Sequence, residues 1–245
     1  MKKFAKFLGA GVGFTMGGPI GALIGFAIGN MIDVFGTDEN VTFQNGYVSN
    51  QTKAGDFEIT LLVLSSYVIK SDGKIDKREL DYVRAYFVKM YGKERANSDF
   101  RLFNEIVKNS SVSLNQVCAQ IKANLDHSYR LQLIHFLFGI ALSDGQADKL
   151  EIDTIAKIAG YLNISLRDFE SIKSMFIATT DAAYRILEID KSATDQELKK
   201  AYRKMVKKYH PDKLESLGAE HRKGAEEKFI AVQEAYEKIV KERGL

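Results

Sequence analysis

Residues 192–213 read SATDQELKKAYRKMVKKYHPDK, and this stretch marks out one helix with a clear start and a clear stop. Thr194, followed three residues later by Glu197, is typical of a capping box at a helix N-terminus. Pro211 lacks an amide hydrogen and disfavours helical backbone at His210, so the helix is expected to stop there. The pattern predicts an amphipathic helix followed by a His-Pro-Asp turn.

The predicted helix has two chemically different faces. A short helix over residues 181–188 precedes it, and a longer one over residues 219–241 follows with apolar residues at helical spacing. Two antiparallel helices and a short third one can bury one small core, so residues 181–245 are expected to form a helical domain. The apolar face is Leu198, Ala201, Tyr202, Met205 and Tyr209, and the cationic face is Lys199, Lys200, Arg203, Lys204, Lys207 and Lys208.

This arrangement resembles the J domain of DnaJ-type co-chaperones over residues 181–245. The resemblance rests on residues 201–204 (AYRK), 210–213 (HPDK) and 228–229 (KF). It implies that His210, Pro211 and Asp212 contact a DnaK-type chaperone and favour its ATP-hydrolysing conformation. It also implies that the cationic face docks on an acidic surface with salt-sensitive affinity. The chemistry then belongs to the partner, and this chain is not itself an enzyme. A solvated helix or an RNA contact is the alternative for that face.

A repeat with an offset of 72 residues lies upstream of this domain. Residues 71–83 (SDGKIDKRELDYV) match residues 143–155 (SDGQADKLEIDTI). Each copy lies between apolar helical patterns. The repeat therefore suggests two helix–loop–helix units related by pseudo-symmetry.

Two interpretations of the repeated loop stay open. Gly73 and Gly145 suit a left-handed helix C-cap, and each Asp-x-x-Glu that follows suits a capping box. Alternatively, if the two loops face each other, their carboxylates could bind a divalent cation through oxygen, with a spacing unlike an EF-hand. The acidic residues concerned are Asp72, Asp76, Glu79, Asp144, Asp148 and Glu151.

The duplicated Ser-Asp-Gly…Asp-x-x-Glu loops in a helical region look like the TerB-like domain, a family linked to tellurite resistance. Such a domain lies in the middle of membrane-anchored DjlA-type co-chaperones. The resemblance implies an all-helical domain over residues 56–178 and makes the acidic residues suspected metal ligands. His127 and His135 lack a spaced partner ligand and are expected to be ordinary core or surface residues. Cys118, the one cysteine, excludes a disulfide framework and is expected in the core.

The first 36 residues are rich in glycine and carry no charged side chain between Lys6 and Asp33. That uncharged stretch exceeds the roughly 20 helical residues that cross a hydrocarbon core. Glycine recurs every fourth residue, which places a stripe without side chains along one side of a helix, as in small-xxx-small membrane interfaces. The pattern predicts one membrane helix that self-associates into a homodimer. The stripe is Gly9, Gly13, Gly17, Gly21, Gly25 and Gly29.

Three other interpretations of this segment stay open. A secretory signal is one, because Lys2 and Lys3 precede the apolar run. A bent hairpin is another, because Gly17-Gly18-Pro19 could break the helix into two halves, each too short to span. A glycine-rich soluble loop is the third. The flanking charges favour a cytoplasmic N-terminus and an external body. Because DnaK and ATP are cytosolic, we instead expect the body to face the cytoplasm at the inner membrane, and a hairpin would reconcile the two.

Length and composition agree with an all-α, multidomain co-chaperone. A chain of 245 residues fits one to two domains, and two prolines and no tryptophan fit a mostly helical protein. With 35 basic and 32 acidic residues, the net charge of +3 argues against a nucleic-acid binder. A membrane-associated stress-response scaffold, whose TerB-like domain binds a metal ion or a protein partner, is the alternative function. The expected parts are a glycine-rich membrane segment (1–36), a linker (37–55), the TerB-like domain (56–178) and the J domain (181–245).

Overall fold

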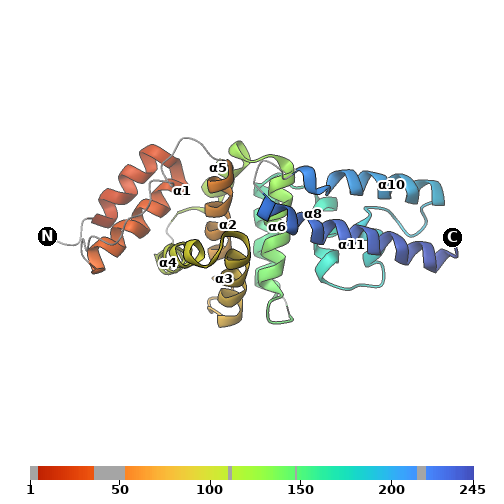
Figure 1. Ribbon diagram of the computed structural model, residues 1–245, viewed down its shortest axis with the longest axis horizontal. Helices are drawn as coiled ribbons and strands as arrows, with labels where there is room; N and C mark the ends of the chain where they lie inside the picture. The colour runs from red at the N-terminus through yellow and green to blue at the C-terminus, as the bar shows by residue number, and fades with distance from the viewer. Residues whose placement is uncertain (1–4, 36–52, 110–111, 147, 214–218) are drawn as a thin grey trace.

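The computed structural model describes residues 5–35, 53–109, 112–146, 148–213 and 219–245. Within these residues the chain forms eleven helices and no strand, which confirms the all-α prediction. Figure 1 shows a molecule with three parts in a row. Helix α1 (Ala5–Phe35) lies at one end, α2 to α8 form the middle, and α10 and α11 reach the other end. The two termini therefore lie far apart.

The middle part is built around α6. This helix is apolar on nearly all sides, and such a helix is expected to be buried. It packs against α2, α3, α7 and α8, and Leu131, Ile134 and Phe138 are fully buried. The helices are α2 (Lys53–Ile69), α3 (Lys77–Tyr91), α4 (Lys93–Asn109), α5 (Leu114–Asn124), α6 (His127–Ala141), α7 (Lys149–Tyr161) and α8 (Leu166–Phe176). Helix α2 begins inside the expected linker, whose residues 37–52 lie outside the described residues.

The repeated loops precede α3 and α7, and both end in a complete capping box. Asp76 accepts a hydrogen bond from the amide of Arg78 at 2.7 Å, and Asp148 accepts one from Leu150 at 2.7 Å. In return, the third-residue glutamates accept from the amides of the two aspartates. Gly73 and Gly145 have φ of 80° and 93°, where glycine is favoured. The capping interpretation is confirmed.

The C-terminal part is a hairpin of α10 (Asp195–Lys208) and α11 (Ala219–Arg243), with the short α9 (Ala182–Ile186) beside it. Leu198 and Met205 of α10 are fully buried with Val232 and Ile239 of α11. The predicted capping box at Thr194 is present. Helix α10 ends at Lys208, two residues before the predicted stop.

The glycine-rich segment is a helical hairpin, so the prediction of one straight membrane helix is wrong. The backbone of Gly17 and Gly18 is non-helical, and Gly18 has φ 60° and ψ −152°, which only glycine adopts readily. The flanking halves, residues 5–16 and 19–35, measure about 18 and about 26 Å at the helical rise. Both are shorter than the hydrocarbon core of about 30 Å. Across the described residues, no helix is long and apolar enough to cross a membrane.

The glycine stripe is the contact between the two halves of this hairpin. A Cβ atom on Gly13 would clash with the backbone carbonyl of Gly21, and one on Gly9 would clash with Gly25. A Cβ atom on Gly29 would likewise clash with the backbone of Ala5 and Lys6. A Cβ atom on Gly17 would meet nothing within 4 Å. The expected self-association face is therefore corrected: the stripe meets its own chain, because the break at Gly17-Gly18 folds it back on itself.

The hairpin packs against α4 and α5. The side chain of Gln120 on α5 bridges the turn, since Nε2 donates to the carbonyl of Gly17 at 2.8 Å and Oε1 accepts from the amide of Ile20 at 3.0 Å. Asn30 donates to Glu105 of α4 at 2.6 Å. The hairpin is thus attached to the helical body at its turn and along its second half.

Candidate functional site

The His-Pro-Asp turn directly follows α10 and is open to solvent. His210 and Asp212 are exposed, and the amide of Asp212 donates to Nδ1 of His210 at 3.3 Å. The imidazole lies edge-on to Phe229 of α11, with ring centroids 6.1 Å apart. The turn is therefore shaped by contacts within residues 210–212 and by one aromatic neighbour on the opposite helix.

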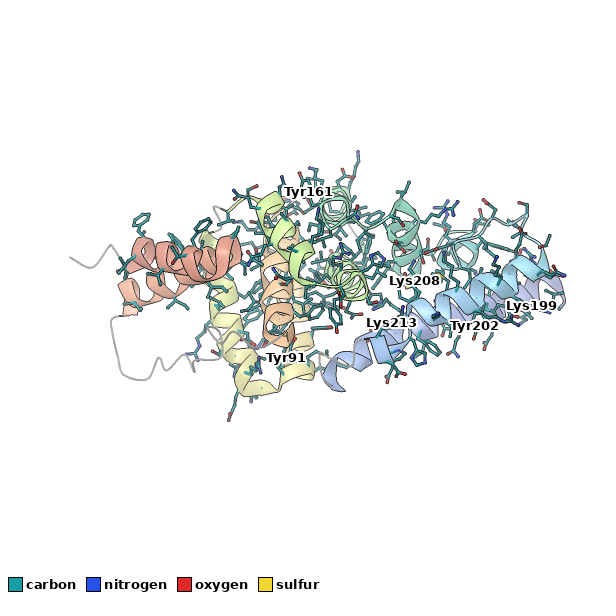
Figure 2. All side chains as sticks on the ribbon, turned by 90° about the horizontal axis from the view of Figure 1, so that it is seen from above. Tyr91, Tyr161, Lys199, Tyr202, Lys208 and Lys213 are labelled. Atoms are coloured by element: carbon teal, nitrogen blue, oxygen red, sulfur yellow. The ribbon has the colours of Figure 1, made fainter. Side chains whose placement is uncertain are left out.

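A shallow groove runs from this turn along α10. It has a volume of about 480 Å³ and combines apolar and basic side chains. Tyr202, which lines the groove, stacks on Tyr236 of α11 with ring centroids 4.2 Å apart. Figure 2 shows Tyr202 near the middle of α10 and Lys199 towards its outer end. The groove is lined by Tyr202, Arg203, Val206, Lys207, His210 and Lys213.

The structure divides the predicted cationic face. Lys199, Lys200, Arg203, Lys204 and Lys207 are exposed. Lys208 differs, because its side chain is only 16% exposed and its Nζ forms ion pairs with Asp168 of α8 and with Glu188. Lys204 also contacts Glu188, at 2.8 Å. One end of the face is thus occupied by carboxylates.

The six acidic residues of the repeat surround one pocket of about 350 Å³, so the two loops do face each other. Arg78 joins the loops, with Nη2 3.3 Å from Asp144. Glu79 is 6% exposed, and its Oε1 has no donor among the described residues. Burial and the adjacent Glu151 raise the pKa of Glu79 to about 9, so Glu79 holds a proton near neutral pH. Among the described residues, no group of three or more acidic, histidine or cysteine side chains is arranged to hold a metal ion.

The C-terminal hairpin also contacts the middle part through residues that sequence patterns did not single out. Lys228 of α11 is buried, and its Nζ donates to the buried Oε1 of Gln132 on α6. Burial lowers the pKa of Lys228 to about 7. On the neighbouring face, Glu170 of α8 lies 3.6 Å from Arg185 of α9. No local pattern could have found these pairs, because each joins residues from separate helices.

The remaining single residues behave as expected. Cys118 and His135 are buried, and burial lowers the pKa of His135 well below its usual value. His127 is half exposed, with Nε2 3.6 Å from Asp168. These residues are core or surface groups, as the sequence predicts.

Comparisons with known families match all three parts of the chain. The family described as tellurite resistance protein TerB matches residues 58–174, and the DnaJ domain matches residues 182–243. The family described as the co-chaperone DjlA transmembrane domain matches residues 1–49. No solved structure matches the chain. Together with the exposed turn at residues 210–212, the DnaJ match defines a J-domain protein.

Full-length relatives specify the family. The co-chaperone protein DjlA of Coxiella burnetii is 28% identical over the whole of both chains. That of Vibrio vulnificus is 30% identical over 80% of this chain and 81% of its own. The chaperone protein DnaJ of Fusobacterium nucleatum is 52% identical, over 22% of this chain only. The chain belongs to the DjlA family of membrane-anchored J-domain co-chaperones.

Proposed function

We propose that this protein stimulates ATP hydrolysis by a DnaK-type chaperone at the membrane surface. The observation that carries the proposal is the turn at the end of a cationic helix, in which His210 and Asp212 are exposed and Pro211 is half-buried. The basic residues of α10 would steer the helix onto an acidic surface of the chaperone. The turn would then contact the chaperone and favour its ATP-hydrolysing conformation.

In this mechanism the partner performs the chemistry. His210 acts as a recognition group, and its Nδ1 already accepts a hydrogen bond from Asp212. The groove beside it offers the apolar surface of Tyr202 and Val206. Burial of this surface against the chaperone would add hydrophobic stabilisation to the attraction between charges. The chain therefore supplies differential binding to one state of the chaperone, which shifts the chaperone's conformational equilibrium.

We also propose that the hairpin α1 holds the protein on the inner membrane with its body in the cytoplasm. The hairpin returns the chain to its starting side, because Asp33 accepts hydrogen bonds from the amides of Ala5 and Lys6. Phe7, Leu8 and Val12 are exposed on the outer surface of the hairpin and would contact lipid. This topology agrees with a DnaK-type partner, which needs ATP.

The experiment is single-turnover ATP hydrolysis by a DnaK-type chaperone, with the full chain added in detergent micelles. Wild type should accelerate hydrolysis, and His210→Gln should lose the acceleration. Lys238→Gln is the control, because this exposed residue of α11 lies outside the turn and the cationic face and should keep full activity. No acceleration by folded wild-type protein with several DnaK-type partners would overturn the proposal. Equal activity of wild type and His210→Gln would remove the role of the turn.

A second proposal concerns the acidic pocket between α3 and α7. Glu79 and the other five carboxylates of the repeat line this pocket, and a divalent cation would take their oxygens as ligands. In that case the protein would act as a membrane-associated scaffold whose TerB-like domain responds to metal. Calorimetry with Ca²⁺ and with Mg²⁺ should give heats that vanish in Asp72→Ala/Asp144→Ala. An absence of heats would show that the pocket binds neither cation, and Glu79 would then be protonated without a metal.

A further inference from the structure

One lysine of the cationic face is bound by a carboxylate of the TerB-like domain. Lys208 lies on the cationic face of α10, yet its ammonium group is bound by Asp168, which belongs to α8 of the TerB-like domain. Glu188, in the loop after α9, binds the same group from the J-domain side. Figure 2 places Lys208 at the end of α10 that lies towards the middle of the molecule, opposite Lys199.

Hydrogen bonds with Ser165 hold the carboxylate of Asp168 in place. Ser165 donates to Oδ2 of Asp168 at 2.6 Å, and the amide of Asp168 donates back to Ser165 at 3.2 Å. Asp168 is 7% exposed. Burial alone would raise the pKa of Asp168, but hydrogen bonds from Lys208 and Ser165 outweigh it and hold this pKa below its usual value. A positioned, ionised carboxylate therefore faces the lysine at neutral pH.

Other contacts keep the two domains in this arrangement. Lys228 reaches Gln132 in the TerB-like core, and Glu170 lies 3.6 Å from Arg185 on α9. Lys89 of α3 lies 3.7 Å from Glu227 of α11. Because these contacts involve α9 and α11, the ion pair between α10 and α8 at Lys208 is one of several between the two domains.

We propose that Asp168 makes the TerB-like domain an internal competitor of the chaperone, so that docking on the cationic face requires Lys208 to leave Asp168. This inference rests on the proposed function, in which that face binds an acidic surface. The carboxylate of Asp168 mimics the charge of that surface and lowers the apparent affinity. The TerB-like domain thereby sets how readily the J domain engages.

The first test measures how strongly Lys208 is protected from a reagent in solution, and it needs no chaperone. The full chain in micelles is treated with an amine-acylating reagent, and the labelling of each lysine is followed by mass spectrometry. Lys208 should react more slowly than its exposed neighbour Lys207, and Asp168→Asn should narrow the difference without closing it, because Glu188 still pairs with Lys208. Continued protection of Lys228 shows that the variant is folded. A Lys208 that reacts as fast as Lys207 in wild type would overturn the proposal.

The second test measures the competition. Asp168→Asn should lower the concentration of protein that gives half-maximal stimulation of the chaperone roughly three- to tenfold. Asp153→Asn is the matched control, because it removes one charge from an exposed position of the TerB-like domain, on α7. The gain should disappear in Asp168→Asn/Lys208→Ala. An unchanged or higher half-maximal concentration in Asp168→Asn would overturn the proposal. If wild type stimulated hydrolysis no more than His210→Gln does, the proposed function itself would be overturned.

Discussion

Glu79 and Glu151 meet across the pocket between α3 and α7, each as the third residue of its helix and each accepting from its own N-cap amide. The same local motif, used twice, brings two carboxyl groups together at the pseudo-symmetry interface. Since two buried carboxylates repel each other, one proton between them is favoured. The pair therefore couples the stability of the TerB-like domain to pH.

Replacing Glu79 by glutamine should remove that coupling. Glu79 binds its proton in the folded protein but not in the unfolded chain between pH 4.5 and about 9, so the free energy of unfolding falls as pH rises through this window. At about 1.4 kcal/mol per pKa unit, linkage sets an upper limit of about 5 kcal/mol on the fall between pH 5 and pH 9. Urea unfolding at pH 5 and pH 9 should show a smaller difference for Glu79→Gln than for wild type. Glu94→Gln, an exposed glutamate in the first turn of α4, should change nothing.

Lys228 should give the opposite trend with pH. Its pKa falls from 10.5 to about 7 on folding, so the unfolded chain binds the extra proton between these values and stability rises with pH. Lys228→Met should flatten this rise, measured as the free energy of unfolding at pH 7, 8.5 and 10. Lys238→Met changes an exposed lysine on the same helix and serves as the control. An unaltered slope in Lys228→Met would show that the amine is not dehydrated.

A side chain on the inner face of the hairpin should force its halves apart. Gly21→Leu would place Cβ against the carbonyl of Gly13, and backbone cannot yield as a side chain does. Amide hydrogen exchange over residues 5–35 should then accelerate about tenfold or more. Gly11→Leu points into open space and should exchange as wild type or more slowly, because leucine favours helix over glycine. Equal effects of the two substitutions would rule out the hairpin contact.

Gln120 should control how firmly the hairpin attaches to the body. Gln120→Ala removes both hydrogen bonds to the turn and should weaken the attachment by about 1–2 kcal/mol. Hydrogen exchange at the amide of Ile20 reports this loss directly. Asn124→Ala removes a side-chain hydrogen bond on the same helix, to the carbonyl of Gln120, and leaves the turn untouched. Faster exchange at Ile20 in Asn124→Ala as well would point to a general loosening of α5.

Local signals in the sequence predicted the parts of this protein well. Capping boxes depend on residues three apart, and the pairs at Asp76, Asp148 and Thr194 all form. The His-Pro-Asp turn follows its helix because proline restricts the residue before it. Helical periodicity also identified the buried face of α10. Each of these features is decided within a few residues, so the sequence could predict them.

Contacts between distant residues could not be predicted in this way. The glycine stripe requires close helix packing, but its period does not say whether the second helix belongs to another chain. Gln120 and Gly17 are 103 residues apart, and Lys228 and Gln132 are 96 apart. Such pairs depend on the angles at which whole helices dock. The ion pair of Lys208 with Asp168 could not be predicted either. Helical periodicity places Lys208 beside Lys207 on the cationic face, and only the position of α8 distinguishes the two lysines.

The burial of Lys228 against Gln132 limits how far the J domain can be exchanged for another. A transplanted J domain with an apolar residue at this position would leave the Gln132 carbonyl oxygen without its donor, and one with a bulkier residue would not fit the site. Chimeras that join this TerB-like domain to a foreign J domain would then carry the turn at a different angle. Exchange of the J domain would therefore require matched changes at residues 132 and 228.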